Sequence, residues 1–126
     1  MRYMLMICTD PAREEAERAK KGDAILAEYG AFSEEMGKRG VLRGGERLRP
    51  ASDAKTVRVE NGKVLTADGP FAETKEALGG YYIVDCDEAQ AIEIAGRIPV
   101  ETRSYVQVRP IALFHPNVAR VSQMKE

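Results

Sequence analysis

The chain has 126 residues, the length of one ordinary domain, and 44% of them are hydrophobic. Its 19 lysines and arginines are balanced by 20 acidic residues, which gives a net charge of -1. This near-neutral balance lacks the basic footprint of proteins that bind nucleic acid or an anionic membrane, so we expect neither partner.

The first strand and the first helix are predicted from residues 3–40. Residues 3–8 are continuously apolar and too short for a helix, which predicts a strand buried on both faces. Asp10 and Pro11 favour a helix start, and Gly40 ends that helix as a left-handed cap. We expect a break or kink near Gly22, where Asp23 can act as a second cap. The inner face follows from residues spaced by four, three and four: Ile25, Tyr29, Phe32 and Met36.

The middle of the chain predicts a weak strand followed by a hairpin. Residues 41–48 form the strand, which Gly44 and Gly45 interrupt and can bulge. Residues 56–60 and 63–67 flank Asn61-Gly62, and this dipeptide between strands favours a type I′ turn. A two-residue turn places Val59 opposite Val64 and Val57 opposite Thr66.

The last third predicts a strand, a helix and a final strand. Residues 80–85 are apolar on both faces, and Asp87 caps the next helix with Gln90 as its capping-box partner. The inner stripe of this helix is predicted to be Ala91, Ile94, Ala95 and Ile98. Residues 104–113 form the last strand. We therefore predict one domain over residues 1–113 and a C-terminal tail over residues 114–126.

The element order predicts an α+β fold. With the hairpin treated as an insertion, strand, helix, strand occurs twice, which is the ferredoxin-like split βαβ pattern of four antiparallel strands. Its two helices cover one face of the sheet, yet the strands at 3–8 and 80–85 carry apolar side chains on both faces. A second copy stacked on the bare face would cover it, so we expect a homodimer that closes an α+β barrel.

The stretch DGPFAETKEALGGYY at 68–82 resembles the YCII-related family, and within it the branch named for the DGPF motif. YGAF at 29–32, GGERLRP at 44–50 and VRPI at 108–111 extend the resemblance over residues 1 to about 113. It implies a dimeric α+β barrel. Some relatives carry a proposed histidine–aspartate acid–base pair, and relatives of the DGPF branch often lie beside sigma factors. Here the single histidine, His115, follows the last strand, so this chain departs from the acid–base pattern.

Asp68 admits two interpretations. As a structural residue it caps the turn before Gly69 and Pro70, and residues 70–78 can then form a short helix ended by Gly79. As a functional residue it acts as a general base, a role for which Glu73 is the other candidate. Both interpretations stay open on the sequence.

The candidate ligand-binding residues fall into two groups. The first group is Lys75 and Glu76, in the charged stretch before residues 80–85, together with Tyr81 of that strand. Lys75 suits an anionic substrate. Gln107 and Arg109 share one face of the last strand with Tyr105, and an arginine there suits a carboxylate or phosphate. These residues predict a small anionic or aromatic ligand.

No metal or cofactor is expected, because one histidine excludes a His-rich site and no CxxC pair is present. The apolar run at 3–8 is too short for a signal peptide or a membrane span, which favours a cytoplasmic protein with reduced cysteines. In the split βαβ sheet we expect the first and third strands to be central, adjacent and parallel, which places Cys8 and Cys86 close together at one sheet edge; the other interpretation is that they are two small apolar side chains with no such relationship. Three functions remain open: a small-molecule enzyme of isomerase or lyase type, a non-catalytic ligand sensor or regulatory partner, and a plain dimerisation module.

Overall fold

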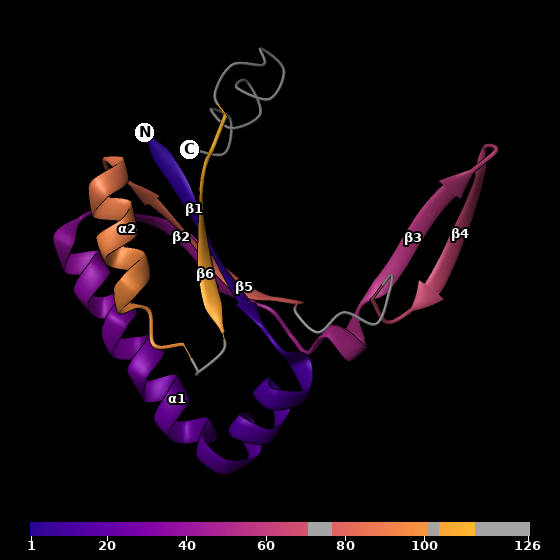
Figure 1. The fold of residues 1–126 in the computed structure, drawn as a ribbon, viewed down its shortest axis with the longest axis horizontal. Helices are drawn as coiled ribbons and strands as arrows, with labels where there is room; N and C mark the ends of the chain where they lie inside the picture. Colours follow the sequence, from indigo (N-terminus) through magenta and orange to yellow (C-terminus); the bar gives the residue numbers. More distant parts are fainter. Residues whose placement is uncertain (71–76, 101–103, 113–126) are drawn as a thin grey trace.

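The computed structural model describes residues 1–70, 77–100 and 104–112, and it shows an α+β fold (Figure 1). The candidate residues Glu73, Lys75 and Glu76, His115 and the predicted tail at 114–126 lie outside the described residues. The elements in chain order are β1 (Arg2–Thr9), α1 (Pro11–Arg39), β2 (Leu42–Arg47), the short 3-10 helix η1 (Ala51–Asp53), β3 (Lys55–Glu60), β4 (Lys63–Asp68), β5 (Ala77–Asp85), α2 (Glu88–Arg97) and β6 (Tyr105–Pro110).

The main sheet has the strand order β2-β5-β1-β6, and every neighbouring pair is antiparallel. This confirms the ferredoxin-like arrangement, with the first and third sheet strands in the centre. The expectation that these two strands are parallel was wrong. The α1 crossover returns the chain so that β2 runs with β1, and β5, which pairs between them, must run against both.

The antiparallel pairing separates the two cysteines. Cys8 lies opposite Leu78 near one end of β1, whereas the Cys86 amide donates to the carbonyl of Met1 at the other end. At about 3.3 Å per residue, the seven steps from Met1 to Cys8 span roughly 20 Å. The two thiols are therefore not neighbours, and both are free.

The hydrophobic core lies between one face of the sheet and the two helices, which Figure 1 shows on the same side of it. Alternate residues of β1 are buried, and those between them are half-buried on the opposite, open face. The predicted helix stripes are confirmed at Phe32 and Met36 on α1 and at Ala91 and Ile94 on α2. The core residues are Tyr3, Leu5, Ile7, Phe32, Met36, Val84, Ala91, Ile94 and Ile98.

Of the break or kink expected near Gly22, the break is absent, because helix α1 is continuous from Pro11 to Arg39 and Asp23 lies inside it. Figure 1 shows that the ribbon nevertheless bends within its N-terminal half. Both ends are capped as predicted. Asp10 accepts a hydrogen bond from the Ala12 amide at 3.0 Å, and Gly40 ends the helix with a φ of 73°.

The β3–β4 hairpin forms a separate two-stranded sheet that projects from the main body (Figure 1). Asn61 and Gly62 have φ values of 50° and 76°, as a type I′ turn requires. The predicted pairs Val59–Val64 and Val57–Thr66 are confirmed. The hairpin valines stay exposed on one face, which places them outside the core.

Candidate ligand-binding pocket

A cavity of about 650 Å³ lies between α1 and the helix-facing side of the sheet, and we call it the α1–sheet pocket. This volume is within the range of roughly 300–1,000 Å³ found for small-molecule sites. The residues that line it and matter below are Ile7, Thr9, Arg13, Ala24, Glu28, Tyr29, Ser33, Gly45, Glu46, Arg47, Gly79, Gly80, Tyr81, Tyr82 and Val100.

Glycines in β2 and β5 line the pocket and allow close packing in its wall. A Cβ atom at Gly45 would lie 2.8 Å from Cδ1 of Tyr82, and a Cβ at Gly80 would lie 2.9 Å from the carbonyl oxygen of Glu46. Gly79 has no partner in β1, because Ile7 pairs with Gly80 and Cys8 with Leu78, so a bulge lies beside the cavity. The backbone of these glycines therefore forms part of the wall, with the Tyr82 ring packed beside Gly45.

A pair of hydroxyl groups connects α1 to β5 at the pocket. Ser33 Oγ and the Tyr82 hydroxyl lie 3.1 Å apart, and either atom can donate. The Tyr82 ring packs edge-on against Phe32, with the ring centres 5.1 Å apart, which fixes its position in the wall. Only one hydroxyl proton is used in the mutual hydrogen bond, so the other can be donated to a ligand.

Two arginines line the pocket near the end of β1. Arg13 lies in the first turn of α1, four residues after Thr9. Arg47 is the last residue of β2 and pairs with Gly80, which in turn pairs with Ile7. Cross-strand partners share a face, so Arg47 lies on the helix-facing side of the sheet.

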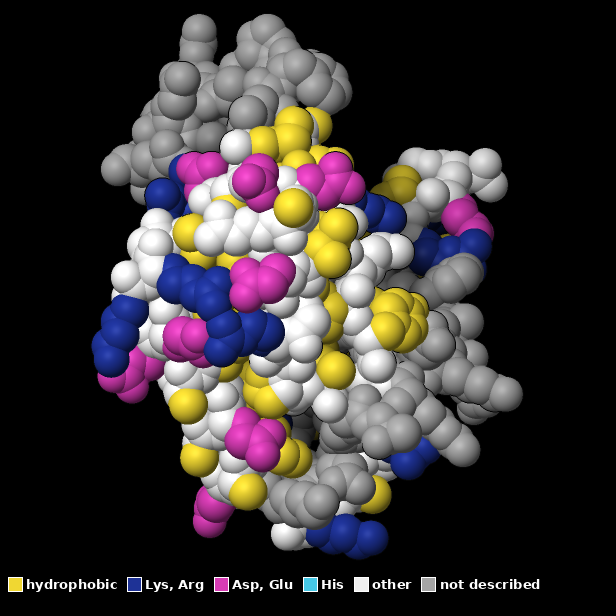
Figure 2. Space-filling model, turned by 60° about the vertical axis from the view of Figure 1, so that its left-hand side comes forward, with side chains coloured by type: hydrophobic (Ala, Val, Ile, Leu, Met, Phe, Trp, Pro, Cys, Tyr) yellow, Lys and Arg dark blue, Asp and Glu magenta, His cyan; other side chains and the backbone are white. Residues whose placement is uncertain are grey.

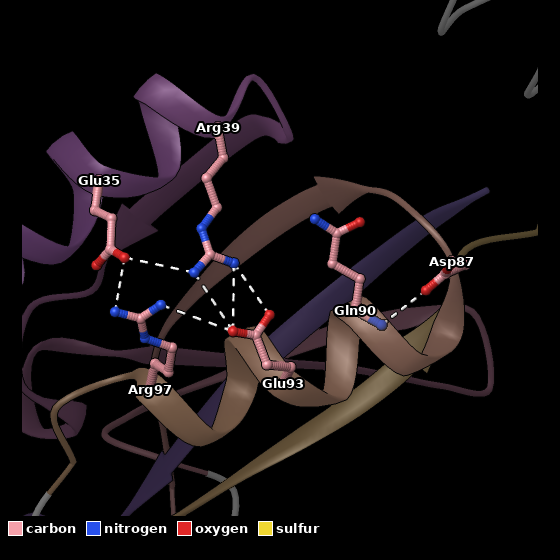
Figure 3. A network of polar contacts seen from close by, with 6 residues as sticks. All are labelled: Glu35, Arg39, Asp87, Gln90, Glu93 and Arg97. Atoms are coloured by element: carbon pink, nitrogen blue, oxygen red, sulfur yellow. Dashed lines mark hydrogen bonds and ion pairs between the residues drawn. The ribbon is translucent and has the colours of Figure 1, made fainter.

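A network of ion pairs joins the C-terminal half of α1 to α2 (Figure 3). Arg39 donates to Glu93 at 3.0 Å, and Arg97 lies 2.7 Å from Glu35. The hydrogen bond from Arg39 lowers the pKa of Glu93, and the same contact raises the pKa of Arg39. We call this network of Glu35, Arg39, Glu93 and Arg97 the α1–α2 clamp, because it joins the two helices outside the pocket.

Among the described side chains on the face in Figure 2, charges of both signs are mixed. On the face shown in Figure 2, acidic and basic side chains lie next to one another, with hydrophobic side chains scattered among them. Among the described residues, no group of three or more His, Cys, Asp or Glu side chains is arranged to hold a metal ion. Within the same residues, no helix is long and apolar enough to cross a membrane.

The structure places Asp68 away from the pocket. It ends β4 in the projecting hairpin, its side chain is 88% exposed, and it forms an ion pair with Lys55. The turn that follows is held from the other strand, because the Thr56 hydroxyl donates to the Gly69 carbonyl at 2.6 Å. Ala77 and Leu78 belong to β5, so the helix that we considered for residues 70–78 does not reach Gly79.

Three other predicted residues meet on the open face of the sheet. Tyr81 of β5 and Gln107 of β6 both pair with Met6 of β1, and Arg109 pairs with Met4. Strand alternation therefore brings Tyr81, Gln107 and Arg109 to one surface. Gln107 and Arg109 do not line the α1–sheet pocket, and Tyr81 borders it along the chain while its side chain belongs to the open face.

Sequence reasoning missed Arg13, Ser33, Arg47 and Tyr82 as site residues. They come from three separate elements, and only the packing of α1 on the sheet brings them together. One signal was available. Gly44-Gly45 and Gly79-Gly80 are paired glycines in two strands, and glycine within a strand marks a bulge or a close approach.

Comparison with known proteins identifies a family and a relative. The model of the YCII-related domain matches residues 1–115 of this chain. The chain is also 35% identical over 121 residues to an uncharacterized protein of Rhizobium meliloti (strain 1021), R00369, covering 92% of this chain and 96% of that protein.

Proposed function

We propose that this chain, which belongs to the YCII-related domain family, is a small-ligand-binding protein that works as a homodimer. The observation that carries the binding role is the α1–sheet pocket, a cavity of ligand size with an apolar wall and a few convergent polar groups. The DGPF sequence at 68–71 supports placing the chain in the branch named for that motif. The two free thiols are compatible with the cytoplasmic location that we propose.

A thermal-shift screen of a small-molecule library tests the binding role. The test variant is Ala24→Trp, because Ala24 is exposed on α1 and lines the pocket, so an indole there fills the cavity. Ala27→Trp is the matched control on the same helix, since Ala27 is exposed and does not line the pocket. Binding compounds should stabilise the parent and Ala27→Trp but not Ala24→Trp. The binding role is wrong if no compound stabilises the parent, or if every hit stabilises all three proteins equally.

The open face of the main sheet supports the homodimer. Met4, Met6, Cys8 and Ile83 lie there on neighbouring strands, and neither helix covers that side. Half-buried apolar side chains gathered on one sheet face that the helices leave open favour an interface, and a two-fold axis lets the same face cover itself. The proposed dimer thus completes the core on the side that the helices leave open.

Solution mass and one pair of variants test the dimer. Light scattering should give twice the mass of one chain for the parent. Ile83→Asp places a charge in the open face and should give a folded monomer, whereas Val59→Asp on the projecting hairpin should remain dimeric. A monomeric parent, or a dimeric Ile83→Asp protein, would exclude this interface. Circular dichroism confirms folding in each case.

An enzyme of isomerase or lyase type is the second candidate. The observation in its favour is the Ser33–Tyr82 hydroxyl pair in the pocket wall, because a positioned tyrosine can transfer protons to a bound substrate. Each hit from the screen would be incubated with the parent and with Tyr82→Phe. Conversion by the parent alone, with binding retained in both, would support catalysis; no conversion leaves binding as the function.

A further inference from the structure

We infer that the α1–sheet pocket selects a ligand with one negative charge on an apolar body, such as an aryl or alkyl carboxylate, and that Arg13 and Arg47 bind its acidic group. This inference rests on the proposed binding function and adds the chemical class of the ligand. It concerns residues other than Lys75 and Arg109, from which an anionic ligand was predicted.

The positions of the two arginines indicate one binding point. Arg47 lies on the helix-facing side of β2, two strands from Ile7, and Arg13 follows the end of β1 by four residues. Strands are about 4.8 Å apart, so the backbone of Arg47 lies roughly 10 Å from β1, and both arginines line the pocket from positions near the same end of β1.

Both guanidinium groups are available to a ligand. Arg39, Arg49 and Arg97 each pair with a carboxylate, whereas neither Arg13 nor Arg47 forms a salt bridge with a described side chain. A guanidinium group has five N–H donors in a planar fork, which matches the two oxygens of a carboxylate. Two such groups beside a cavity favour an acceptor-rich ligand.

The remaining pocket residues define the rest of the ligand. The Ser33–Tyr82 pair offers one further hydroxyl proton, which suits another ligand oxygen. Ile7, Tyr29 and Val100 provide the apolar surface. Glu28 borders the pocket as well, fifteen residues or about four helical turns beyond Arg13. Its carboxylate disfavours a second negative group, which is why we infer a monoanion. The Glu46 side chain belongs to the open face, since Glu46 pairs with Tyr81.

The test compares an anionic probe with a neutral probe of the same shape. 3-Phenylpropionate and 3-phenylpropan-1-ol would be titrated into the full chain at constant ionic strength, with Kd measured by ligand-detected NMR. The parent should bind the carboxylate about tenfold or more tighter than the alcohol, because hydrogen bonds to charged groups are the stronger kind. Phenylphosphonate, titrated in parallel, shows whether a phosphoryl group is preferred to a carboxylate.

Three variants identify the groups responsible. Arg47→Gln and Arg13→Gln should each lose most of the preference for the carboxylate and bind the alcohol as the parent does. Arg109→Gln is the matched control, since Arg109 also lacks a described salt bridge but lies on the open face. It should bind both probes like the parent.

The outcomes separate this inference from the function on which it rests. Equal affinity of the parent for both probes, or an unchanged preference in Arg47→Gln and Arg13→Gln, overturns the ligand class and leaves the binding role intact. If neither probe binds while library compounds stabilise the parent but not Ala24→Trp, the ligand class alone is wrong. If neither probe nor library compound binds, both fail.

Discussion

The hydroxyl groups of Ser33 and Tyr82 lie 3.1 Å apart and join helix α1 to strand β5 across the wall of the α1–sheet pocket. The two residues are 49 positions apart in sequence, and the stretch between them includes the whole projecting hairpin. This hydrogen bond holds the Tyr82 side chain in the pocket wall. The same contact therefore contributes to the stability of the fold and to the shape of the pocket.

Removing either hydroxyl should destabilise the protein by the same small amount. Tyr82→Phe keeps the edge-on packing against Phe32 and loses only the hydrogen bond, which should cost about 1 kcal/mol in the free energy of unfolding. Ser33→Ala should cost a similar amount, and the double variant should cost less than the sum, because the contact is lost only once. Chemical denaturation measures all three; strictly additive losses would show that the two hydroxyls act independently.

Adding a methyl group at Gly45 should disturb the pocket wall. In Gly45→Ala the new Cβ meets the Tyr82 ring and the Tyr81 carbonyl oxygen at 2.8 and 3.0 Å, so the ring must move. We expect a loss of about 1–3 kcal/mol, as for other overpacked sites. The neighbouring Gly44→Ala is the control, because its Cβ would meet Ile83 at an ordinary 3.9 Å. Equal thermal midpoints for the two variants would contradict this account of the wall.

The burial difference between two strand valines should appear directly in stability. Val84 is fully buried in β5, whereas Val59 on the hairpin is 68% exposed. Val84→Ala should cost about 2 kcal/mol from lost transfer energy and the cavity left behind. Val59→Ala should change the free energy of unfolding by less than about 0.5 kcal/mol. A large loss at Val59 in urea denaturation would mean that the hairpin valines are covered in solution.

The α1–α2 clamp should make stability depend on acid. The pKa of Glu93 is lowered in the folded protein by its hydrogen bond with Arg39. The stability that the ionised Glu93 contributes is therefore present above the pKa of the unfolded state and is lost as pH falls through the pKa of the folded state. Glu93→Gln should therefore be less stable than the parent at neutral pH, and the two curves should converge in acid. The difference in the free energy of unfolding between the two proteins should be modest and should shrink in high salt, because the Arg39–Glu93 pair is exposed. Denaturation curves between pH 7 and pH 3 measure it; a constant gap would exclude the clamp as its source.

The thiol of Cys86 should react slowly at neutral pH. Burial raises its pKa, and the carboxylates of Asp87 and Asp85 raise it further, so less thiolate is present than for an ordinary cysteine. In Cys8→Ala, the rate at which iodoacetamide alkylates Cys86 should be low at pH 7.5. This rate should still be rising at the pH where the alkylation rate of a free thiol has reached its plateau. A plateau at the pH of a free thiol would contradict this prediction.

Local signals in the sequence were sufficient for most elements. Asn61-Gly62 predicted the hairpin and its register, because positive φ at both turn positions determines the pairing. Asp10, Gly40 and Asp87 predicted the helix ends through hydrogen bonds to nearby backbone groups. These features depend on a few adjacent residues, which is why they can be read without the fold.

Features that depend on packing could not be predicted in this way. The pocket is lined jointly by residues of α1 and by Gly45 and Gly80 of the sheet, and no local pattern in the sequence specifies how the helix packs there. The separation of Cys8 and Cys86 likewise follows from strand direction, which is set by the connections around β5. Asp68 was a candidate turn cap or general base from the sequence, whereas the structure gives it an exposed ion pair with Lys55 on the hairpin.

The most direct test of the central claim is an NMR titration of the ¹⁵N-labelled protein with the compounds that stabilise it. If the α1–sheet pocket is the binding site, the amide shifts should concentrate at Thr9, Ser33, Gly45 and Gly80, and those of residues 57–64 on the hairpin should stay unchanged. Shifts confined to the open sheet face around Met6 and Gln107, or to the hairpin, would contradict the claim and would place ligand binding outside the pocket.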